Sequence, residues 1–493
     1  MSNVIVYRGV YRASKSAREF SLGCRLRQIL FRPTRGDLRR TGGTRISFFR
    51  IELVCYIYDS HMEAFRPYVV RLEELLDRSM RPKQDAAFPK DLDAALDGQP
   101  SAELRRQVPI NVLRETGAFF TGSAMAKLAI NAAGLRLTPD VKVLDPACGA
   151  GDLLVAMARL LPCSSDLSST LRDWGRRVLA LDLQANFVRA TKLRLALAAI
   201  RRQSPGHRTK LPNLDELFPG VGLGSSLSEE NLYKQATHIL INPPFTPVDA
   251  PEACSWGSGK VNSAAVFMDT CVLRSEPGTQ IIAILPDVLR SGSRYAKWRQ
   301  LFEERVAIRR IKIVGQFDRH TDVDVFVVVG QIRKTHKSPT KFDWIPSEKN
   351  RALRIRDKFD VSVGAVVSYR DPHEGAWFPF IQARDLPSWE VVSAFSHHRR
   401  FSGKTFRPPF VVVRRTSRPG DKNRAVGTVI RGRDRIAVEN HLLVLRPRDR
   451  RVASCEMLLA VLKEKEANEF LDRRIRCRHL TVSALSDLPW SGQ

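Results

Sequence analysis

The sequence predicts an α/β protein whose central part is a doubly wound, Rossmann-like domain. Between residue 141 and about residue 333, short apolar strands alternate with helical patterns. The strands are brief runs rich in Val, Ile and Leu, which is typical of strands buried on both faces of a parallel sheet. Because strands that alternate with helices imply right-handed βαβ crossovers, we expect helices on both faces of this sheet.

The elements of this domain can be assigned along the chain. The clearest strands are VKVLD, RRVLALD, THILIN and TQIIAILP, and the helices between them are LLVAMARLL, ANFVRATKLRLALAAI and SAAVFMDTCVLRS. Two later strands, RRIKIVGQF and VDVFVVVGQIRK, are joined by a polar turn. This pair predicts a hairpin at one edge of the sheet.

The composition changes on both sides of the strand-helix pattern, so we expect four parts. Residues 1–61 are a basic segment, and 62–116 are a helical region that opens with MEAFRPYVVRLEELLDRSM. Residues 117–335 form the central domain. Residues 336–493 are expected to form a mixed α/β domain, with strands FVVVRR and HLLVLRP followed by the helical stretch CEMLLAVLKEKEANEFLDRR.

The basic segment 1–61 is crowded with Arg, poor in Asp and Glu, and shows no clear period. One interpretation is a basic arm that binds DNA. The other is an upstream extension of the reading frame, disordered or foreign to the functional protein, with the functional start at Met62. We favour the second, and sequencing the N-terminus of the native protein would decide between them.

The formal net charge of +28 on 493 residues favours a polyanionic partner, because each neutralised phosphate releases condensed counterions. No apolar run reaches the roughly 18 residues that span a bilayer, so no membrane partner is expected. The eight Cys include no CxxC and no Cys/His cluster at metal spacing. We therefore expect reduced, mostly buried thiols, no bound metal and a cytoplasmic location.

The segment VKVLDPACGAGDLLVAMARLL is a strand, a tight glycine turn and a helix. Gly149 and Gly151 allow the backbone to turn sharply and approach a ligand, and the helix start offers unpaired N–H groups. Asp145 ends the strand and suits a ligand ammonium group. In open α/β sheets, ligands lie outside the carboxyl ends of the strands. A structural turn is the alternative for this segment taken alone.

Two further carboxylates follow. Asp182 ends the next strand, VLALD, and can accept two hydrogen bonds from a ribose diol. Asp215, in PNLDELF, is expected after a third strand, where it would meet an adenine amine. A solvated loop position is the alternative for Asp215, since that strand is poorly marked.

The buried strand THILINPPF delivers Asn242, Pro243, Pro244 and Phe245 at its carboxyl end. An amine conjugated to a ring is a poor nucleophile, and two acceptors aimed at its hydrogens free its lone pair. The Asn242 amide oxygen and the Pro243 carbonyl can be these acceptors, and consecutive prolines hold the backbone rigid. Phe245 can stack on a base taken out of a duplex. A strand-ending turn is the alternative for these four residues alone.

These motifs together resemble the N6-adenine DNA methyltransferases of restriction-modification systems. DPACGAGD is similar to their methionine-binding loop, and ETGAFFTG (Glu115 to Gly122) is similar to the segment that their gamma class places before that loop. The resemblance implies S-adenosyl-L-methionine as cofactor, with Phe120, Thr121 and Ala147 among its contacts. Gly122 stands where Pro is usual, and Asp152 where Asn, Thr or Ala is more common.

The residues after the NPPF motif are assigned less directly. Residues 246–262 are polar and rich in Pro, Gly and Ser, which favours a flexible loop that closes over a flipped base. Lys260 and Trp256 are candidates to touch DNA, although a mobile surface loop explains them equally well. Phe267 resembles the apolar contact of this family to the cofactor adenine, and a core position in the helix is its alternative.

The C-terminal domain resembles DNA target-recognition domains in outline, and RHLTVSALSDLPW is similar to their closing segment. A basic segment with turn residues suits phosphate and guanine contacts. A solvated basic hairpin is the alternative. The residues concerned are Arg414, Arg415, Arg418, Lys422 and Arg424.

The resemblance implies a site-specific adenine DNA methyltransferase of a restriction-modification or phage-defence system. Double-stranded DNA is then the substrate, and a restriction or specificity subunit is a candidate partner. An RNA methyltransferase or a glutamine-N5 protein methyltransferase is the alternative, because both use Asn-Pro-Pro-aromatic motifs. A non-catalytic DNA-binding subunit is the alternative of another class, but it would predict damage to Asn242, Gly149 or Asp145, and all three are intact.

Overall fold

The computed structural model describes residues 62–81, 85–135, 137–203, 211–318, 321, 323–334, 342–345 and 353–492. The basic segment 1–61, with both of its interpretations, lies outside the described residues. The chain divides between Ser60 and His61, and all the described residues lie in the second unit. Within the described ranges, no helix is both long and apolar enough to cross a bilayer.

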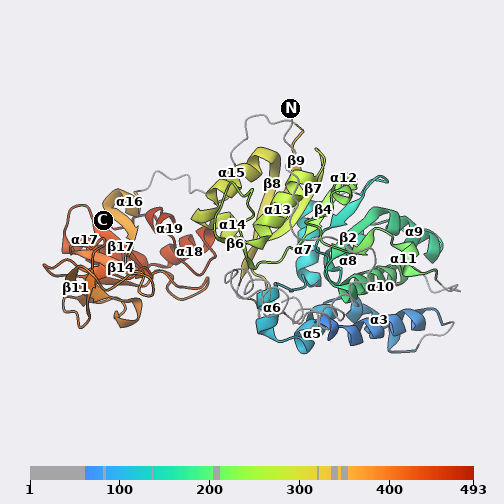
Figure 1. Cartoon of the computed structure of the whole chain (residues 1–493), viewed down its shortest axis with the longest axis horizontal. Coiled ribbons are helices and arrows are strands. Elements are labelled where there is room, and N and C mark those ends of the chain that lie inside the picture. The colour runs from blue at the N-terminus through green and yellow to red at the C-terminus, as the bar shows by residue number, and fades with distance from the viewer. Residues whose placement is uncertain are drawn as a thin grey trace, which may run out of the picture. The chain divides into compact units, whose positions relative to one another are not determined.

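A seven-stranded sheet forms the core of the central domain (Figure 1). Its strand order is β3-β2-β1-β4-β7-β9-β8. The first five strands in this order are parallel to one another, whereas β9 is antiparallel to both of its neighbours. The predicted doubly wound sheet is confirmed, and the predicted edge hairpin is β8–β9. The strands are β1 (Val143–Asp145), β2 (Val178–Asp182), β3 (Val221–Leu223), β4 (His238–Ile241), β7 (Gln280–Pro286), β8 (Val306–Gln316) and β9 (Asp324–Ile332).

The winding of the sheet reverses between β1 and β4. From β1 the chain passes through α8 and α9 to β2, whereas from β4 it passes through α13 to β7 in the opposite direction. Right-handed crossovers in opposite directions place their helices on opposite faces of the sheet. The carboxyl ends of β1 and β4 therefore meet at the reversal, where open α/β sheets bind ligands.

The helices of the central domain connect these strands. They are α7 (Ser123–Ala133), α8 (Asp152–Ala158), α9 (Leu167–Arg177), α10 (Ala185–Arg202), α11 (Leu214–Leu217), α12 (Asn231–Gln235), α13 (Ser263–Arg274), α14 (Asp287–Ser291) and α15 (Ala296–Arg305). A small hairpin of β5 (Pro247–Asp249) and β6 (Lys260–Asn262) stands apart from the main sheet.

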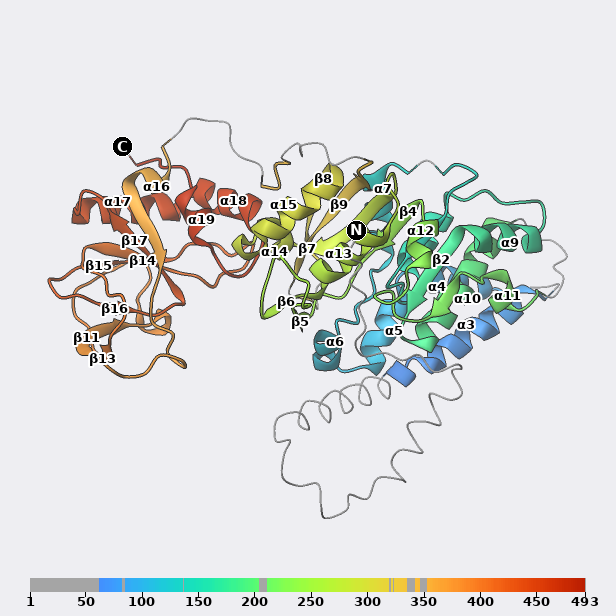
Figure 2. The same cartoon turned by 45° about the horizontal axis from the view of Figure 1, so that its top comes forward.

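The N-terminal region is helical, as its amphipathic pattern predicts. Its helices α3 and α4 pack against α10 of the central domain, and α3 runs beside α10 in Figure 2. This contact buries the apolar face of α3, including Tyr68, Leu72 and Leu75. The helices are α3 (Arg66–Ser79), α4 (Phe88–Leu96), α5 (Gln99–Gln107) and α6 (Ile110–Thr116).

The C-terminal region contains a five-stranded sheet, β10-β17-β14-β15-β12, and a three-stranded sheet, β13-β11-β16. The predicted helical stretch is two helices, because Glu464 is extended (φ −61°, ψ 148°) and separates α17 from α18. The elements are α16 (Ile355–Lys358), β10 (Phe359–Val363), β11 (Ala376–Ile381), β12 (Val391–Val392), β13 (His398–Phe401), β14 (Phe410–Arg414), β15 (Gly427–Ile430), β16 (Ala437–Val438), β17 (Leu442–Pro447), α17 (Val452–Lys463), α18 (Lys465–Arg474) and α19 (Val482–Ser486).

A buried ion pair directly after β7 ties the sheet to the C-terminal segment. The Asp287 carboxylate accepts from Arg290 Nε (2.6 Å) and from the backbone N–H of Arg476 (3.0 Å). Arg290 in turn donates to the carbonyls of Trp344 and Arg474 (3.2 and 3.3 Å). Asp287 and Arg290 are 1% and 0% exposed. Burial of charge is tolerated only when it is paired and hydrogen-bonded, and both conditions hold here.

Candidate active site

The NPPF motif follows β4, and its first residue has a defined orientation. The Asn242 side-chain Nδ2 donates to Thr121 Oγ1 at 3.1 Å. The Asn242 Oδ1 is buried and has no hydrogen-bond partner among the described residues. A buried amide oxygen without a partner costs free energy, on the order of 1–3 kcal/mol. Because Asn242 also lines a cavity, this oxygen is a candidate acceptor for a ligand hydrogen.

The backbone carbonyls of the motif differ in what they bind. The Pro244 carbonyl accepts from Ser263 Oγ, and the Phe245 carbonyl accepts from Asn262 Nδ2 at 3.1 Å. In the part of the chain that the structure describes, the Pro243 carbonyl accepts no hydrogen bond. The start of α13 thus holds the second half of the motif in place and leaves the Pro243 carbonyl available beside Asn242.

The ETGAFFTG segment packs directly against the NPPF motif, although they lie more than 100 residues apart in the chain. A Cβ on Gly117 would meet the Pro244 Cβ at 2.8 Å and the Thr246 methyl at 2.9 Å. Gly117 also has a φ of +71°, which favours glycine. This close approach and the hydrogen bond from Asn242 to Thr121 bring the two motifs into one site.

A cavity of about 370 Å³ opens beside the motif. Asn242, Pro243 and Phe245 line it, together with residues that the sequence did not single out. The rings of Phe245 and Phe317 lie 6.0 Å apart, edge to face. A pocket with aromatic walls and two acceptors that bind no donor among the described residues fits a flat molecule that carries N–H groups. The residues missed from sequence are Arg114, Gly117, Phe119, Thr246, Phe317, Thr321, Val323 and Arg478.

The doublet Phe119-Phe120 was a signal that could have found one of these residues. Phe120 lies over the glycine turn, because its ring would be 2.9 Å from a Cβ on Gly149. Its other contacts are the rings of Phe65 and Phe187, at 5.5 and 4.8 Å. Phe119 lines the cavity instead. Neighbouring aromatic side chains thus serve two different parts of the site.

The glycine turn after β1 is held by carboxylates at the strand ends. Asp145 accepts from the Ala147 N–H at 3.2 Å, and Asp182 accepts from the Gly149 N–H at 2.9 Å. Gly149 and Gly151 have φ of +52° and +81°. A Cβ on Gly151 would meet Thr191 at 2.9 Å, so the turn is closed tightly by α10.

Both carboxylates are perturbed by their surroundings. Burial raises the pKa of Asp145 to about 8, with a smaller contribution from the nearby charge of Asp182. Burial also raises the pKa of Asp182 to about 6. Among the described residues, neither is paired with a Lys or Arg. Two carboxylates in these surroundings fit a ligand that brings a cation and hydroxyl donors, as S-adenosylmethionine does.

The prediction that Asp215 follows the third strand is wrong. The third strand begins at Val221, so Asp215 precedes it in α11 and does not follow it. Asn213 caps this short helix, and Asp215 pairs with Lys192 at 2.6 Å with its side chain 65% exposed. This pairing lowers the pKa of Asp215. The segment that leaves the carboxyl end of β3 begins at Gly224 instead.

The segment after the NPPF motif is more ordered than the sequence predicts. Residues 246–262 contain the β5–β6 hairpin, across which Lys260 pairs with Asp249 at 2.8 Å. Trp256 is buried, and its indole N–H donates to Asp269, so it is unavailable to DNA. Phe267 is half-buried on α13 and packs against the core cluster of the sheet.

Arg424, predicted to contact DNA, is a buried structural residue. Its side chain is 0% exposed and donates to the carbonyls of Ile475 and Cys477 at 3.1 and 3.2 Å. It also lies 3.4 Å from Asp472. Burial lowers the pKa of Arg424. The guanidinium holds the C-terminal segment and faces no solvent, so the prediction is corrected.

The other basic residues of this segment divide into two kinds. Arg414 donates to the Leu386 carbonyl (2.6 Å) and Arg415 to the Asn440 carbonyl (2.9 Å), and both are half-buried. Arg418 and Lys422 are exposed. A role in DNA binding is therefore sterically open mainly to these two.

No protein-family model matches the chain, and no curated protein matches it. Among solved structures, the chain is similar to the type IIG restriction endonuclease BpuSI, with 12% identity over 88% of this chain and 70% of that one (TM-score 0.36). It is also similar to the type IIL restriction-modification enzyme MmeI in complex with DNA, with 10% identity over 80% of this chain and 70% of that one (TM-score 0.45). A third similar structure is a type I restriction-modification methyltransferase subunit from Streptococcus thermophilus, with 16% identity over 48% of this chain and 50% of that one (TM-score 0.33).

The chain thus spans only half the length of the Streptococcus subunit. Identities and TM-scores this low carry no information on activity. The fold is evident from the chain itself, since a seven-stranded mixed sheet with β9 reversed is typical of the S-adenosylmethionine-dependent methyltransferase fold.

Proposed function

We propose that this protein transfers a methyl group from S-adenosyl-L-methionine to the N6 amine of adenine in double-stranded DNA. The observation that carries the proposal is the orientation of Asn242. Its amide nitrogen is held by Thr121, its buried oxygen is without a partner among the described residues, and the residue lines an aromatic cavity. An amine that must be activated by acceptors fits this arrangement.

The chain supplies positioning and polarisation, and the cofactor supplies the electrophilic methyl group. The Asn242 oxygen and the Pro243 carbonyl accept the two amine hydrogens, which frees the nitrogen lone pair. Phe245, with Phe119 and Phe317 close by, stacks on the extruded base. Base-aromatic stacking contributes about 1–3 kcal/mol per base, which offsets part of the cost of unstacking.

We assign the cofactor to the turn after β1. Asp145 would hold the ammonium group, and Asp182 the ribose hydroxyls. Phe120, Thr121, Ala147, Gly149, Gly151 and Phe267 are the other proposed contacts. We omit Asp215, whose place is taken by the segment after β3.

The choice of adenine in DNA, the gamma-class order and a role in restriction-modification or phage defence rest on the sequence resemblance. The GAFFTG segment, the RHLTVSALSDLPW segment and a net charge that is still +20 without residues 1–61 support DNA as the substrate. A restriction or specificity subunit remains a proposed partner, and Lys260, Arg414, Arg415, Arg418 and Lys422 remain proposed DNA contacts.

The proposal is tested with the full chain, labelled S-adenosylmethionine and duplex DNA from a host without adenine methylation. We expect label in DNA, recovered as N6-methyladenine, and a recognition sequence from single-molecule sequencing of an expressing strain. Total RNA and whole-cell protein are tested in parallel. Label recovered only from RNA or from glutamine would replace the proposed substrate, and no transfer to any of the three would refute the activity.

The affinity for the cofactor should depend on pH. Without ligand, Asp145 binds a proton below a pKa of about 8, and this proton must leave before the carboxylate can pair with an ammonium group. We therefore expect affinity to fall as pH decreases below 8, by at most about tenfold per unit, with Asp182 adding to the loss near its pKa of about 6.

Calorimetry in buffers of different ionisation enthalpy measures this effect as proton release at pH 7. Asp145→Asn is the control, since it should bind more weakly and release fewer protons. Equal affinity of the unmodified chain at pH 6.5 and pH 8.5 would contradict the assignment of Asp145.

A further inference from the structure

A second buried ion pair lies behind the glycine turn and takes no part in the proposed contacts. Asp152, the first residue of α8, pairs with Arg194 of α10 at 2.9 Å. Their side chains are 3% and 1% exposed. Arg194 also donates to the Ala95 carbonyl at 2.8 Å and to the Ala150 carbonyl of the turn. Both of its backbone partners fix its position.

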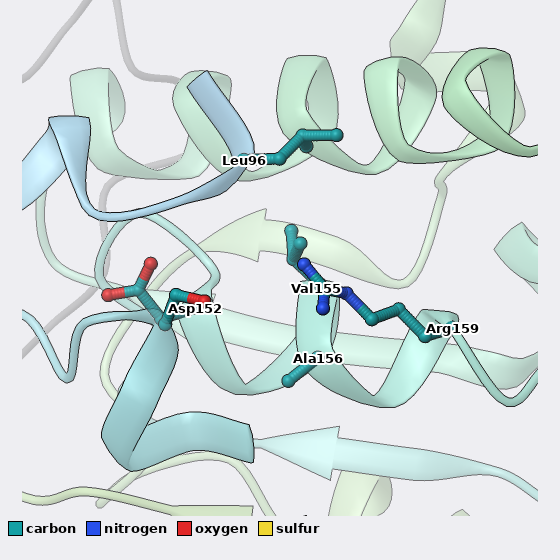
Figure 3. Close-up of a pocket in the computed structure, with 6 residues that line it drawn as sticks. Leu96, Asp152, Val155, Ala156 and Arg159 are labelled. Carbon is teal, nitrogen blue, oxygen red and sulfur yellow. The ribbon is translucent and has the colours of Figure 1, made fainter. Parts of the chain in front are cut away.

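The other Asp152 oxygen reaches the GAFFTG segment. It accepts from the Gly122 backbone N–H at 2.7 Å. Gly122 has a φ of +72°, so neither Pro nor most other residues could adopt this backbone and still donate this bond. The two positions at which the chain departs from the usual motif are therefore bonded to each other. Figure 3 shows Asp152 at the start of α8, near Leu96 and Val155.

Thr121, the residue before Gly122, orients the side-chain amide of Asn242. Thr121 Oγ1 accepts from Asn242 Nδ2. Because this bond engages the amide nitrogen, Oδ1 is left as the acceptor of the amide, whereas a reversed amide would present N–H groups to an amine. The backbone of residues 121–122 must be fixed for Thr121 to do this.

We propose that Asp152 is a positioning residue for Asn242, which acts by holding the Gly122 N–H and thereby placing the Thr121 hydroxyl. This inference rests on the proposed function, because it requires Asn242 to be the acceptor for the target amine. Arg194 orients the Asp152 carboxylate from the opposite side. Asp152 thus connects the cofactor turn, the GAFFTG segment and the target amine, although it touches neither substrate nor cofactor.

The test compares three variants of the full chain. Asp152→Ala combined with Arg194→Gln, called the double variant, removes the acceptor without leaving a buried charge unpaired. The conservative variant, Asp152→Asn with the same Arg194→Gln, keeps one acceptor oxygen for Gly122. Asp173→Ala is the matched control, because Asp173 pairs with Arg176 and Arg177 on α9 of the same domain. The readouts are kcat, the cofactor dissociation constant, and hydrogen exchange of the peptide spanning residues 115–123.

We expect the double variant to remain folded, to lose at least tenfold in kcat, and to exchange the 115–123 peptide at least tenfold faster. The conservative variant should retain kcat within threefold, and Asp173→Ala should match the unmodified chain. In a Thr121→Val background, removing Asp152 should lower kcat less than twofold further, because its effect passes through Thr121.

The proposal is overturned if the folded double variant keeps kcat within threefold, or if its loss is equally large in the Thr121→Val background. Unchanged exchange of the 115–123 peptide would also overturn it. This readout needs no catalysis, so it separates failure of the positioning role from failure of the proposed function, which Asn242→Ala tests.

Discussion

Asn242→Ala should lower the rate of methyl transfer to DNA by on the order of 10²- to 10³-fold, the effect of removing one preorganised polar group from a transition state. The alanine removes the only side-chain acceptor proposed for the target amine and leaves the Pro243 carbonyl alone to polarise it. It also relieves the unpaired buried oxygen, so the folded protein should lose no stability from this source. Single-turnover kinetics with labelled cofactor measures the chemical step.

The cofactor dissociation constant provides the control for this variant. The Asn242 side chain bonds to Thr121 and not to the glycine turn, so cofactor binding should change only through the proposed Thr121 contact, and much less than the rate of methyl transfer. Asp145→Ala should show the opposite pattern, with weaker binding as its main effect. Transfer by Asn242→Ala at a rate near that of the unmodified chain would show that the assigned mechanism is wrong.

The largest loss of stability is expected for Asp287→Ala. The substitution leaves Arg290 buried at 0% exposure without its carboxylate. It also removes the side-chain acceptor of the Arg476 N–H and one of the two acceptors of Ser291 Oγ, which keeps the backbone carbonyl of residue 287. Breaking a buried ion pair by removing one partner typically costs about 3–5 kcal/mol. Urea denaturation, followed by tryptophan fluorescence, should show this as a lower free energy of unfolding.

The exposed pair Lys260–Asp249 is the matched comparison. Its side chains are 63% and 82% exposed, and exposed ion pairs contribute about 0–1 kcal/mol. Asp249→Ala should therefore change the free energy of unfolding by less than a quarter of the loss in Asp287→Ala. Similar losses in the two variants would mean that the buried pair is not a principal tie between β7 and the C-terminal segment.

The central sheet was predictable because its strands carry their own signal. Runs such as HILI in β4 and QIIAILP in β7 are buried along almost their whole length, and only a strand between two layers of helices requires this composition. β3 is just three residues, VGL, and is half exposed at its end. Its weak signal led to the misplacement of Asp215, which lies in a capped turn of helix before the strand.

The errors on Arg424 and Trp256 have a common cause. Each looks like a surface residue in its local sequence, among Pro, Gly, Ser and charged neighbours. Their partners lie elsewhere: Arg424 binds carbonyls about 50 residues later, and Trp256 bonds to a carboxylate on α13. Local composition cannot report a burial that depends on distant elements. The cavity residues Phe317 and Arg478 were missed for the same reason.

Gly122 and Asp152 show a second limit of what can be predicted from the sequence. The sequence identified both as departures from a familiar pattern, 30 residues apart, but offered no relation between them. The hydrogen bond between them shows that they depend on each other. A substitution that looks tolerable at either position alone therefore has to be judged with the other in place.

The Asn242 oxygen, which has no partner among the described residues, also bears on which bases the proposed methyltransferase would reject. A buried oxygen acceptor is satisfied only by a hydrogen donor, so a purine that carries a carbonyl at the reacting position would set one acceptor against another. Sites that leave buried polar groups opposed or unpaired can reject an incorrect substrate by about 10⁴- to 10⁵-fold. Guanine and deaminated adenine would be excluded by this single atom, before any contact with the surrounding sequence is read.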